Sequence, residues 1–310
     1  MRRIAIGSAW VTEIGLGTAQ LGDLFEEMRL ETATQIVDAA WQGGVRYFDT
    51  APHYGLGLAE ERLGIALAAR PREDYALSTK VGRLVLDVDG GRIRRWDFSA
   101  DGVRRSLDAS RRRLGTERID IALIHDPEEH LDESIDDAYP ALAELRARGE
   151  LGAVGVGTRH LPSLLRFVRE TDVDVVMVAG RLTLLDHSAL EGLVAACGDR
   201  GVRIIGAGVF NSGILASPLP SSHARYDYRV ASPELVTRAR ELAALADQHG
   251  YTLPEAAMAF ARHRPEVASL VIGADSVGQL ESTLRSAAAV GDRDGLVEAV
   301  IHPETRRETL

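Results

Sequence analysis

Short runs of apolar residues alternate with longer amphipathic segments along most of the chain. The apolar runs contain many Val, Ile and Leu residues and end at polar or glycine positions, as expected of strands buried on both faces. They lie at Ile14–Thr18, Arg46–Asp49, Ala76–Lys80, Ile119–His125, Ala153–Gly157, Val173–Val178, Val202–Ala207 and Ser269–Gly273. We therefore predict eight strands.

The segments between these runs repeat their apolar residues with the period of an α-helix. They are Thr32–Gln42, Ala59–Ala69, Ala100–Leu114, Ile135–Arg148, Leu161–Arg169, Ser188–Arg200, Pro233–Gln248 and Val277–Ala289. Gly149 and Gly201 directly follow predicted helices, where glycine commonly ends a helix. The alternation of strands with helices predicts a parallel sheet.

Eight strand–helix units in about 250 residues match a single (β/α)8 barrel. A doubly wound sheet would need a glycine fingerprint after its first strand, and the Gly15–Gly17 turn lacks the third glycine of that pattern. We predict one α/β barrel domain over residues 1–310. An N-terminal hairpin at Ile4–Thr12 and a partly helical extension at Gly295–Leu310 are expected to decorate it.

Composition narrows the class of partner. The 310 residues carry a formal net charge of −10, whereas nucleic acids and anionic membranes select a basic face. The single Cys197 excludes an internal disulfide framework, and no stretch reaches the roughly 18–20 apolar residues of a membrane span. Met1-Arg2-Arg3 is not followed by the apolar segment of a secretion signal. We expect a cytoplasmic protein that acts on a small molecule and binds neither nucleic acid nor membrane.

Four polar side chains follow successive predicted strands, at the edge where barrels of this kind place catalytic groups. Asp49, Lys80 and His125 end the second, third and fourth strands, and Tyr54 lies in the loop after Asp49. Singly, each has a plain structural explanation, such as a turn residue, a rim residue or an exposed charge. Their coincidence on successive strands instead favours one active site.

Hydride transfer explains why these residue types would meet. Oxidation of a hydroxyl needs a base for its proton, and a free tyrosine with a pKa of about 10 is a poor base at neutral pH. A lysine ammonium about 4 Å from Tyr54 would favour its phenolate by about 4 kcal/mol at an effective dielectric constant of 20. We predict that Lys80 lowers the pKa of Tyr54. Asp49 would keep Lys80 charged, and His125 would donate a hydrogen bond to the reacting oxygen.

The sequence around these positions resembles the aldo-keto reductase superfamily, whose tetrad is Asp, Tyr, Lys and His in this order. The resemblance covers nearly the whole chain, through Gly15–Thr18, Phe48–Gly55 and Val271–Ala274. More narrowly, the chain is similar to the branch of L-fucose dehydrogenase, D-threo-aldose 1-dehydrogenase and pyridoxal 4-dehydrogenase. The motifs that indicate this branch are Gly57–Gly64, Trp96–Ser99, His125–Pro127, Ala179–Arg181 and Gly208–Gly213.

The resemblance implies a nicotinamide-dependent oxidoreductase that oxidises the C1 hydroxyl of a cyclic sugar, or a similar hemiacetal, to a lactone, with Tyr54 as the base. It implies cofactor contacts at Thr18, Thr158, Arg159, Phe210, Asn211, Gly213, Gly273, Ala274, Asp275 and Gln279. Many relatives hold the adenosine 2′-phosphate with basic residues near Asp275. An acidic residue would repel that phosphate, so NAD is favoured over NADP. Alternatively, Asp275 only caps the helix that follows it.

The chain departs from the family pattern at the cofactor site. Arg159 stands where an Asn usually contacts the nicotinamide carboxamide. Further differences are Ala179 for Gln, Ala207 for Tyr and Leu182 for Tyr. The Arg159 substitution keeps open a non-catalytic subunit that senses the cofactor, whereas the complete tetrad favours an enzyme. Within the enzyme interpretation, NADPH-dependent reduction of an aldehyde or ketone is the alternative to sugar oxidation.

Trp96, in the loop after the third strand, is predicted to form an apolar wall of the substrate pocket. The neighbouring Arg92, Arg94 and Arg95 fit ordinary surface charges better than a substrate clamp. A metal-dependent barrel hydrolase is disfavoured, because none of the nine histidines forms a His-x-His pair or a His-Glu-x-x-His pattern. We therefore expect no metal site.

Overall fold

The apolar runs of the sequence form a closed barrel of eight parallel strands in the computed structural model, which describes residues 1–290. The barrel strands are β3 (Ile14–Gly17), β4 (Tyr47–Asp49), β5 (Ala76–Val81), β8 (Ile121–His125), β9 (Ala153–Thr158), β10 (Val175–Ala179), β11 (Arg203–Ala207) and β14 (Val267–Ile272). Each strand neighbours the next in this order, and β14 pairs with β3 to complete the ring. The prediction of a (β/α)8 barrel is confirmed.

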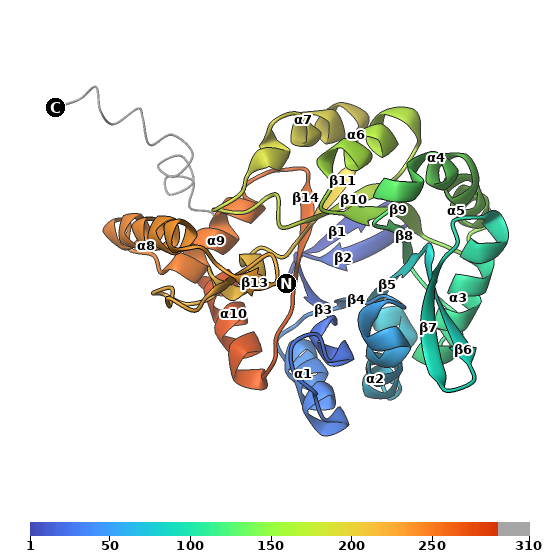
Figure 1. Cartoon of the computed structure of the whole chain (residues 1–310), viewed down its shortest axis with the longest axis horizontal. Helices are drawn as coiled ribbons and strands as arrows, with labels where there is room; N and C mark the ends of the chain where they lie inside the picture. The colour runs from blue at the N-terminus through green and yellow to red at the C-terminus, as the bar shows by residue number, and fades with distance from the viewer. Residues whose placement is uncertain (291–310) are drawn as a thin grey trace.

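Helices surround the barrel on its outside (Figure 1). They are α1 (Leu30–Gln42), α2 (Leu58–Leu67), α3 (Ala100–Leu114), α4 (Leu131–Glu133), α5 (Tyr139–Ala147), α6 (Leu161–Glu170), α7 (Leu193–Arg200), α8 (Pro233–Gln248), α9 (Leu253–Arg262) and α10 (Val277–Ala289). Their apolar sides pack on the strands: Ile36 of α1 and Leu63 of α2, for example, are fully buried in one cluster with Phe48 of β4. This packing fixes each strand between two layers of apolar contacts.

Alternate residues of each strand point toward the barrel axis and toward the helices. In β4, Tyr47 belongs to the interior cluster and Phe48 to the outer one, which turns Asp49 back to the interior. In β5, the Ser78 and Lys80 side chains both hydrogen-bond to Asp49, whereas Thr79 between them bonds to a residue of α2. The strand period therefore sets the direction of the polar groups at the strand ends.

A hairpin closes the amino-terminal end of the barrel. Strands β1 (Arg3–Ile6) and β2 (Ala9–Thr12) pair antiparallel, as predicted from the sequence. Ile6 and Val11 are buried in the interior cluster of the barrel, and the backbone N–H of Ser8 donates to the oxygen of Gly152 at 2.9 Å. The carboxyl ends of the strands, here called the mouth, lie at the opposite end.

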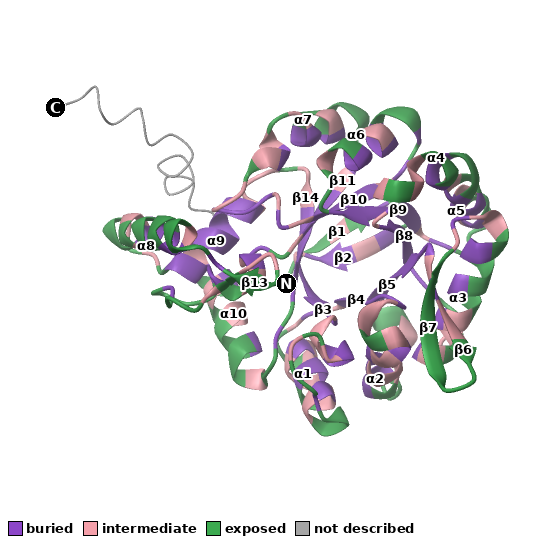
Figure 2. Ribbon diagram, in the orientation of Figure 1, coloured by how far each residue is buried: buried purple, intermediate pink, exposed green. Residues whose placement is uncertain are grey.

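Several elements differ from the sequence prediction. Trp96 was expected in a loop, but it ends the strand β7 (Gly91–Trp96), which pairs with β6 (Arg83–Val88) in a hairpin that projects into solvent (Figure 2). Helix α9 was not predicted; eight of its ten residues are buried, and only Glu255 and Arg262 are charged.

Other parts of the chain complete the described structure. A second short hairpin, β12 (Arg225–Tyr226) and β13 (Arg229–Val230), lies between β11 and α8. The extension predicted at Gly295–Leu310 lies outside the described residues. Within residues 1–290, no helix has the length and apolar character needed to cross a membrane.

Candidate active site

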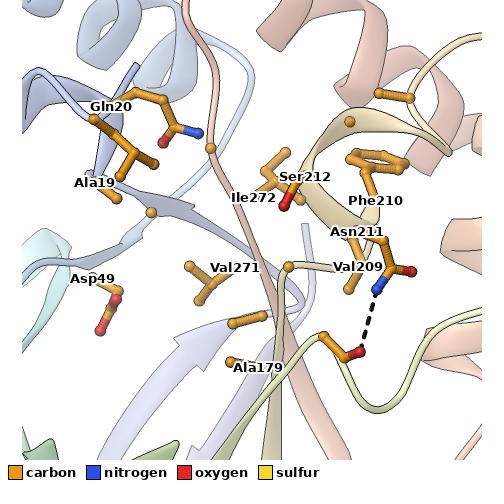
Figure 3. A pocket seen from close by; sticks show the side chains of 18 of the residues that line it. Ala19, Gln20, Asp49, Ala179, Val209, Phe210, Asn211, Ser212, Val271 and Ile272 are labelled. Carbon is orange, nitrogen blue, oxygen red and sulfur yellow. Dashed lines mark hydrogen bonds between the residues drawn. The ribbon is translucent and has the colours of Figure 1, made fainter. Parts of the chain in front are cut away.

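A cavity of about 710 Å³ opens at the mouth of the barrel. Its lining comes from the ends of the barrel strands and the loops that follow them, and it includes the four residues predicted to be catalytic: Asp49, Tyr54, Lys80 and His125. In Figure 3, Asp49 and Gln20 lie on one side of this cavity and Phe210 and Asn211 on the other. The structure thus brings together groups from opposite sides of the barrel.

Lys80 is the hub of the polar cluster. Its Nζ atom donates to Oδ2 of Asp49 at 2.7 Å, to the backbone oxygen of Thr50 at 2.9 Å and to the phenolic oxygen of Tyr54 at 3.1 Å. The three bonds use all three donors of an ammonium group. The side chain is only 2% exposed, so these bonds hold the ammonium group in one position.

Asp49 is held on both carboxylate oxygens. Oδ2 accepts from Lys80, and Oδ1 accepts from the hydroxyl of Ser78 at 2.6 Å. Ser78 is itself hydrogen-bonded to the Tyr47 hydroxyl at 2.9 Å, and the Thr18 hydroxyl donates to the backbone oxygen of Asp49 at 3.0 Å. This interior network keeps the carboxylate aimed at the ammonium.

Burial works against the charge on Lys80, but the neighbouring Asp49 and Tyr54 outweigh it, so the pKa of Lys80 is raised above its usual value. This agrees with the predicted role of Asp49 as the group that keeps Lys80 charged. Burial raises the pKa of Tyr54 above 10, and Lys80 lowers it by a smaller amount. Lys80 thus lowers the pKa of Tyr54, as predicted, but removal of the phenol from water outweighs this attraction, so the net shift is upward.

Tyr54 begins a tight turn, Tyr54–Gly57, that follows β4. Gly55 adopts a φ of +60°, and a Cβ atom on Gly22 would lie 2.6 Å from the carbonyl carbon of Tyr54. Only glycine tolerates this close approach of the two loops. The loop after β3 therefore packs directly against the Tyr54 backbone.

His125 is buried and neutral. Burial, together with the positive charges of Lys80 and Arg83, holds the pKa of His125 well below 6.5. Its ring stands edge-on to that of Tyr54, with ring centroids 6.0 Å apart. Its Nδ1 atom has no hydrogen-bond partner within residues 1–290. Because His125 and Tyr54 both line the cavity, a neutral imidazole there can donate one hydrogen bond to a ligand oxygen.

Most of the predicted cofactor contacts also line the cavity. They are Thr18, Thr158, Arg159, Phe210, Asn211, Gly213, Gly273, Asp275 and Gln279, whereas Ala274 is buried away from it. The Asn211 side chain donates from Nδ2 to the oxygen of Gly180 at 3.2 Å, which ties the turn after β11 to the turn after β10 (Figure 3). Oδ1 of Asn211 is buried without a partner in the described part of the chain. It offers an acceptor to an amide or hydroxyl of a ligand, so the lining fits a nicotinamide cofactor.

Arg159 is paired with residues of the β12–β13 hairpin. Its guanidinium lies 3.4 Å from Oδ2 of Asp227, and the same carboxylate is 3.0 Å from Arg181. The Arg159 guanidinium is also 5.5 Å from the centre of the Tyr228 ring. Arg159 is therefore engaged by the β12–β13 hairpin at the rim.

Asp275 is not the cap of α10. The Ser276 hydroxyl accepts from the backbone N–H of Gln279 at 3.3 Å and fills that role. Partial burial and the nearby carboxylate of Glu26 raise the pKa of Asp275, while Arg225 lowers it. The alternative that Asp275 only caps the helix is therefore wrong. Asp275 is one of the residues that line the cavity.

Trp96 lies outside the lining of this cavity. It stacks on Phe98 at 5.8 Å, and the Arg83 guanidinium lies 4.3 Å from its ring centre. Several lining residues were not anticipated: Gln20, Phe25, Asp126, Asp227 and Tyr228. Asp126 directly follows His125 and could have been found by the same strand-end rule. Phe25 and Tyr228, with ring centroids 6.2 Å apart, meet only through folding of two distant loops.

Comparisons with known proteins agree with this geometry. The model of the aldo/keto reductase family matches residues 13–294. The chain is 41% identical to D-threo-aldose 1-dehydrogenase from a Pseudomonas species, over 90% of each chain. It is 34% identical to pyridoxal 4-dehydrogenase from Microbacterium luteolum, over 88% of this chain and 89% of that one. Its fold superposes on an aldo-keto reductase from Bacillus halodurans with a TM-score of 0.79 and 25% identity, covering 97% of this chain and 95% of the other.

Proposed function

Because the chain belongs to the aldo/keto reductase family and is thus an oxidoreductase, we propose that it oxidises the C1 hydroxyl of a cyclic aldose, L-fucose-like in class, to a lactone with NAD. The observation that carries this proposal is the Lys80 ammonium, which donates at once to Asp49 and Tyr54 inside the cavity. A phenol held against a fixed ammonium is a proton-transfer device.

In this proposal, Tyr54 removes the proton of the C1 hydroxyl. The Lys80 ammonium, 3.1 Å from the phenolic oxygen, stabilises the phenolate that accepts this proton. Asp49 holds the ammonium charged and aimed, because its other oxygen is fixed by Ser78. Neutral His125 donates a hydrogen bond to the same substrate oxygen and positions it beside Tyr54.

Aldo-keto reductases use nicotinamide cofactors, and the oxidised nicotinamide ring would accept the hydride from C1. The residues that would hold the cofactor are the predicted contacts that line the cavity. Asn211 offers a buried acceptor, and the turn at Asn211–Gly213, whose three residues have positive φ, lines the cavity after β11. The carboxylate of Asp275 favours ribose hydroxyls over a 2′-phosphate, which supports NAD.

The substrate class is supported by the relatives. An aldose 1-dehydrogenase and a pyridoxal dehydrogenase both match nearly the full chain. Both names describe dehydrogenases, which oxidise their substrates. Reduction of simple aldehydes with NADPH remains the second candidate.

The test is a panel of aldoses, pyridoxal and simple aldehydes. Each substrate is assayed for oxidation with NAD and NADP, and the aldehydes are also assayed for reduction with NADH and NADPH. The absorbance of the reduced nicotinamide measures turnover. We expect the highest kcat/KM with an aldose and NAD. Turnover confined to aldehydes and NADPH would replace this proposal with the reductase. Cofactor binding without any turnover would favour the sensing subunit.

A further inference from the structure

Asp126 is the residue after His125 and lines the cavity beside the catalytic cluster. We propose that Asp126 recognises the hydroxyl on the carbon next to the reacting carbon, with Arg83 as its positioning residue. The preferred substrates would then be α-hydroxy carbonyl compounds and the sugars that correspond to them. This inference deepens the proposed function and rests on it for the identity of the reacting carbon.

The backbone holds Asp126 in an unfavourable conformation. Its φ is +43°, and it precedes Pro127, although non-glycine residues rarely adopt the left-handed region. Its N–H donates to the oxygen of Gly157 at 3.0 Å, so β9 helps to fix this conformation. Strain of this kind persists where the surrounding structure enforces it, and it is concentrated at functional sites.

The carboxylate lies between a cation and the imidazole of the tetrad. Oδ2 of Asp126 is 3.1 Å from a guanidinium nitrogen of Arg83 and 3.7 Å from Nε2 of His125. The distance to His125 is too long for a hydrogen bond. The imidazole and the carboxylate are thus neighbours that do not bond to each other and can act on two different oxygens of one ligand.

This spacing suits two oxygens on adjacent carbons. The first oxygen, on the reacting carbon, would take the hydrogen bond from His125 and face Tyr54. The second, a hydroxyl, would donate to the carboxylate of Asp126. An ionised acceptor makes a stronger hydrogen bond to a hydroxyl than a neutral one does.

Arg83 keeps this acceptor in place. It lies at the start of β6, and its guanidinium stacks 4.3 Å from the Trp96 ring centre while its charge faces Asp126. Its Nε atom is buried and has no partner among residues 1–290. The predicted pocket wall Trp96 would therefore influence the substrate through Arg83 instead of through direct contact.

The experiment compares substrates that differ by one hydroxyl. Glycolaldehyde and acetaldehyde are reduced with NADH and NADPH, and L-fucose and its 2-deoxy analogue are oxidised with NAD. For the wild type we expect kcat/KM to be roughly 10- to 100-fold higher for the hydroxylated member, the size of a hydrogen bond to a charged group. The readout is the ratio within each pair.

Two variants remove the carboxylate at little cost to the backbone. Asp126→Gly tolerates the positive φ and removes the acceptor, and Asp126→Asn keeps the shape but loses the charge. We expect the ratio to fall about 10-fold or more in Asp126→Gly and less in Asp126→Asn. Arg83→Lys should keep more of the ratio than Arg83→Met, because the lysine preserves a charge beside Asp126.

The matched control is Asp132→Asn in α4. Its side chain is 82% exposed, pairs with Arg166 and lies outside the cavity lining, so the ratio should stay unchanged. Equal losses on both members of a pair in Asp126→Gly would overturn the inference, since Asp126 would then only support the His125 backbone. A wild type that does not distinguish the members would also overturn it.

Failure of the proposed function gives a different result. If the wild type prefers glycolaldehyde through Asp126 but oxidises no aldose, the dehydrogenase proposal fails while the hydroxyl recognition stands. If aldoses are oxidised with no preference over the 2-deoxy analogue, the dehydrogenase proposal stands while the hydroxyl recognition fails.

Discussion

The two ends of the barrel each bury a carboxylate, but they use it differently. Asp120, at the amino-terminal end, is 3% exposed, and Asp49, at the mouth, is 2% exposed. Asp120 accepts from Arg72 at 2.6 Å, from the N–H of Leu77 at 2.8 Å and from Arg118 at 2.8 Å. Asp49 also binds a cation, the Lys80 ammonium, but Lys80 donates a further hydrogen bond to Tyr54 in the cavity.

Hydrogen-bond satisfaction separates the Asp120 cluster from the residues at the mouth. The Asp120 cluster has protein partners on both oxygens and packs beside the β1–β2 hairpin. At the mouth, Nδ1 of His125 and Oδ1 of Asn211 have no partner among the described residues. Five non-glycine residues with positive φ line the cavity: Asp126, Asn211, Ser212, Asp227 and Tyr228. Groups whose bonds are complete stabilise the fold, whereas open and strained groups are available to a ligand.

Removal of the Tyr54 hydroxyl should show the difference between the two ends most clearly, because it should lower activity and leave stability unchanged. We expect Tyr54→Phe to lower kcat by roughly 10²- to 10⁴-fold, because the proton acceptor is lost. The Lys80–Asp49 pair remains, so the melting temperature should stay close to that of the wild type. Steady-state kinetics and thermal unfolding measure the two effects. Undiminished turnover would remove Tyr54 from the mechanism.

The pH dependence of oxidation is expected to report Tyr54 alone. Burial raises the pKa of Tyr54 above 10. Below that pKa the phenolate fraction grows about tenfold per pH unit, so kcat for oxidation should rise from pH 7 to pH 9. The pKa of His125 lies well below 6.5, so no histidine limb is expected above pH 6. A plateau in kcat that begins near pH 7 would show that the bound cofactor lowers the pKa of Tyr54.

The amino-terminal carboxylate should give the opposite result to Tyr54. Asp120→Ala leaves the Arg72 guanidinium unpaired and the Leu77 N–H without its acceptor. We expect the free energy of unfolding to fall by about 3 kcal/mol, with kcat of the folded enzyme within a factor of about two of the wild type. Denaturant titration measures the loss. Asp108→Ala, an exposed carboxylate that pairs with Arg111, is the control and should change stability little.

The sequence was most informative where local period decides the structure. Strand alternation and strand-end position were enough to place Asp49, Lys80 and His125 at one mouth. The direction of the Tyr54 pKa could not be read this way, because it depends on how far the folded loops remove the phenol from water. The sequence spacing predicts that Lys80 lowers the pKa of Tyr54, but it does not predict how far burial raises that pKa.

The rim of the cavity was the least predictable region. Arg159 meets Asp227, and Phe25 meets Tyr228, through loops that lie far apart in the sequence. Neither contact leaves a periodic signal. Trp96 was placed in a loop because the pairing of β6 with β7, which orients it, depends on register between polar strands.

The smallest expected effect concerns the choice of cofactor at the mouth. Asp275→Ser removes a carboxylate from the lining, and Ser276 still caps α10, so the helix should stay in place. Because the mutation removes like-charge repulsion of a 2′-phosphate, kcat/KM with NADP should rise about tenfold, and that with NAD should fall a few-fold. Asp247→Ser, at an exposed position of α8 outside the cavity, is the matched control for net charge. If both variants change the NADP to NAD ratio equally, general charge decides the preference. If only Asp275→Ser changes it, the carboxylate acts at the adenosine ribose, and the mouth selects its cofactor with a group that contributes little to stability.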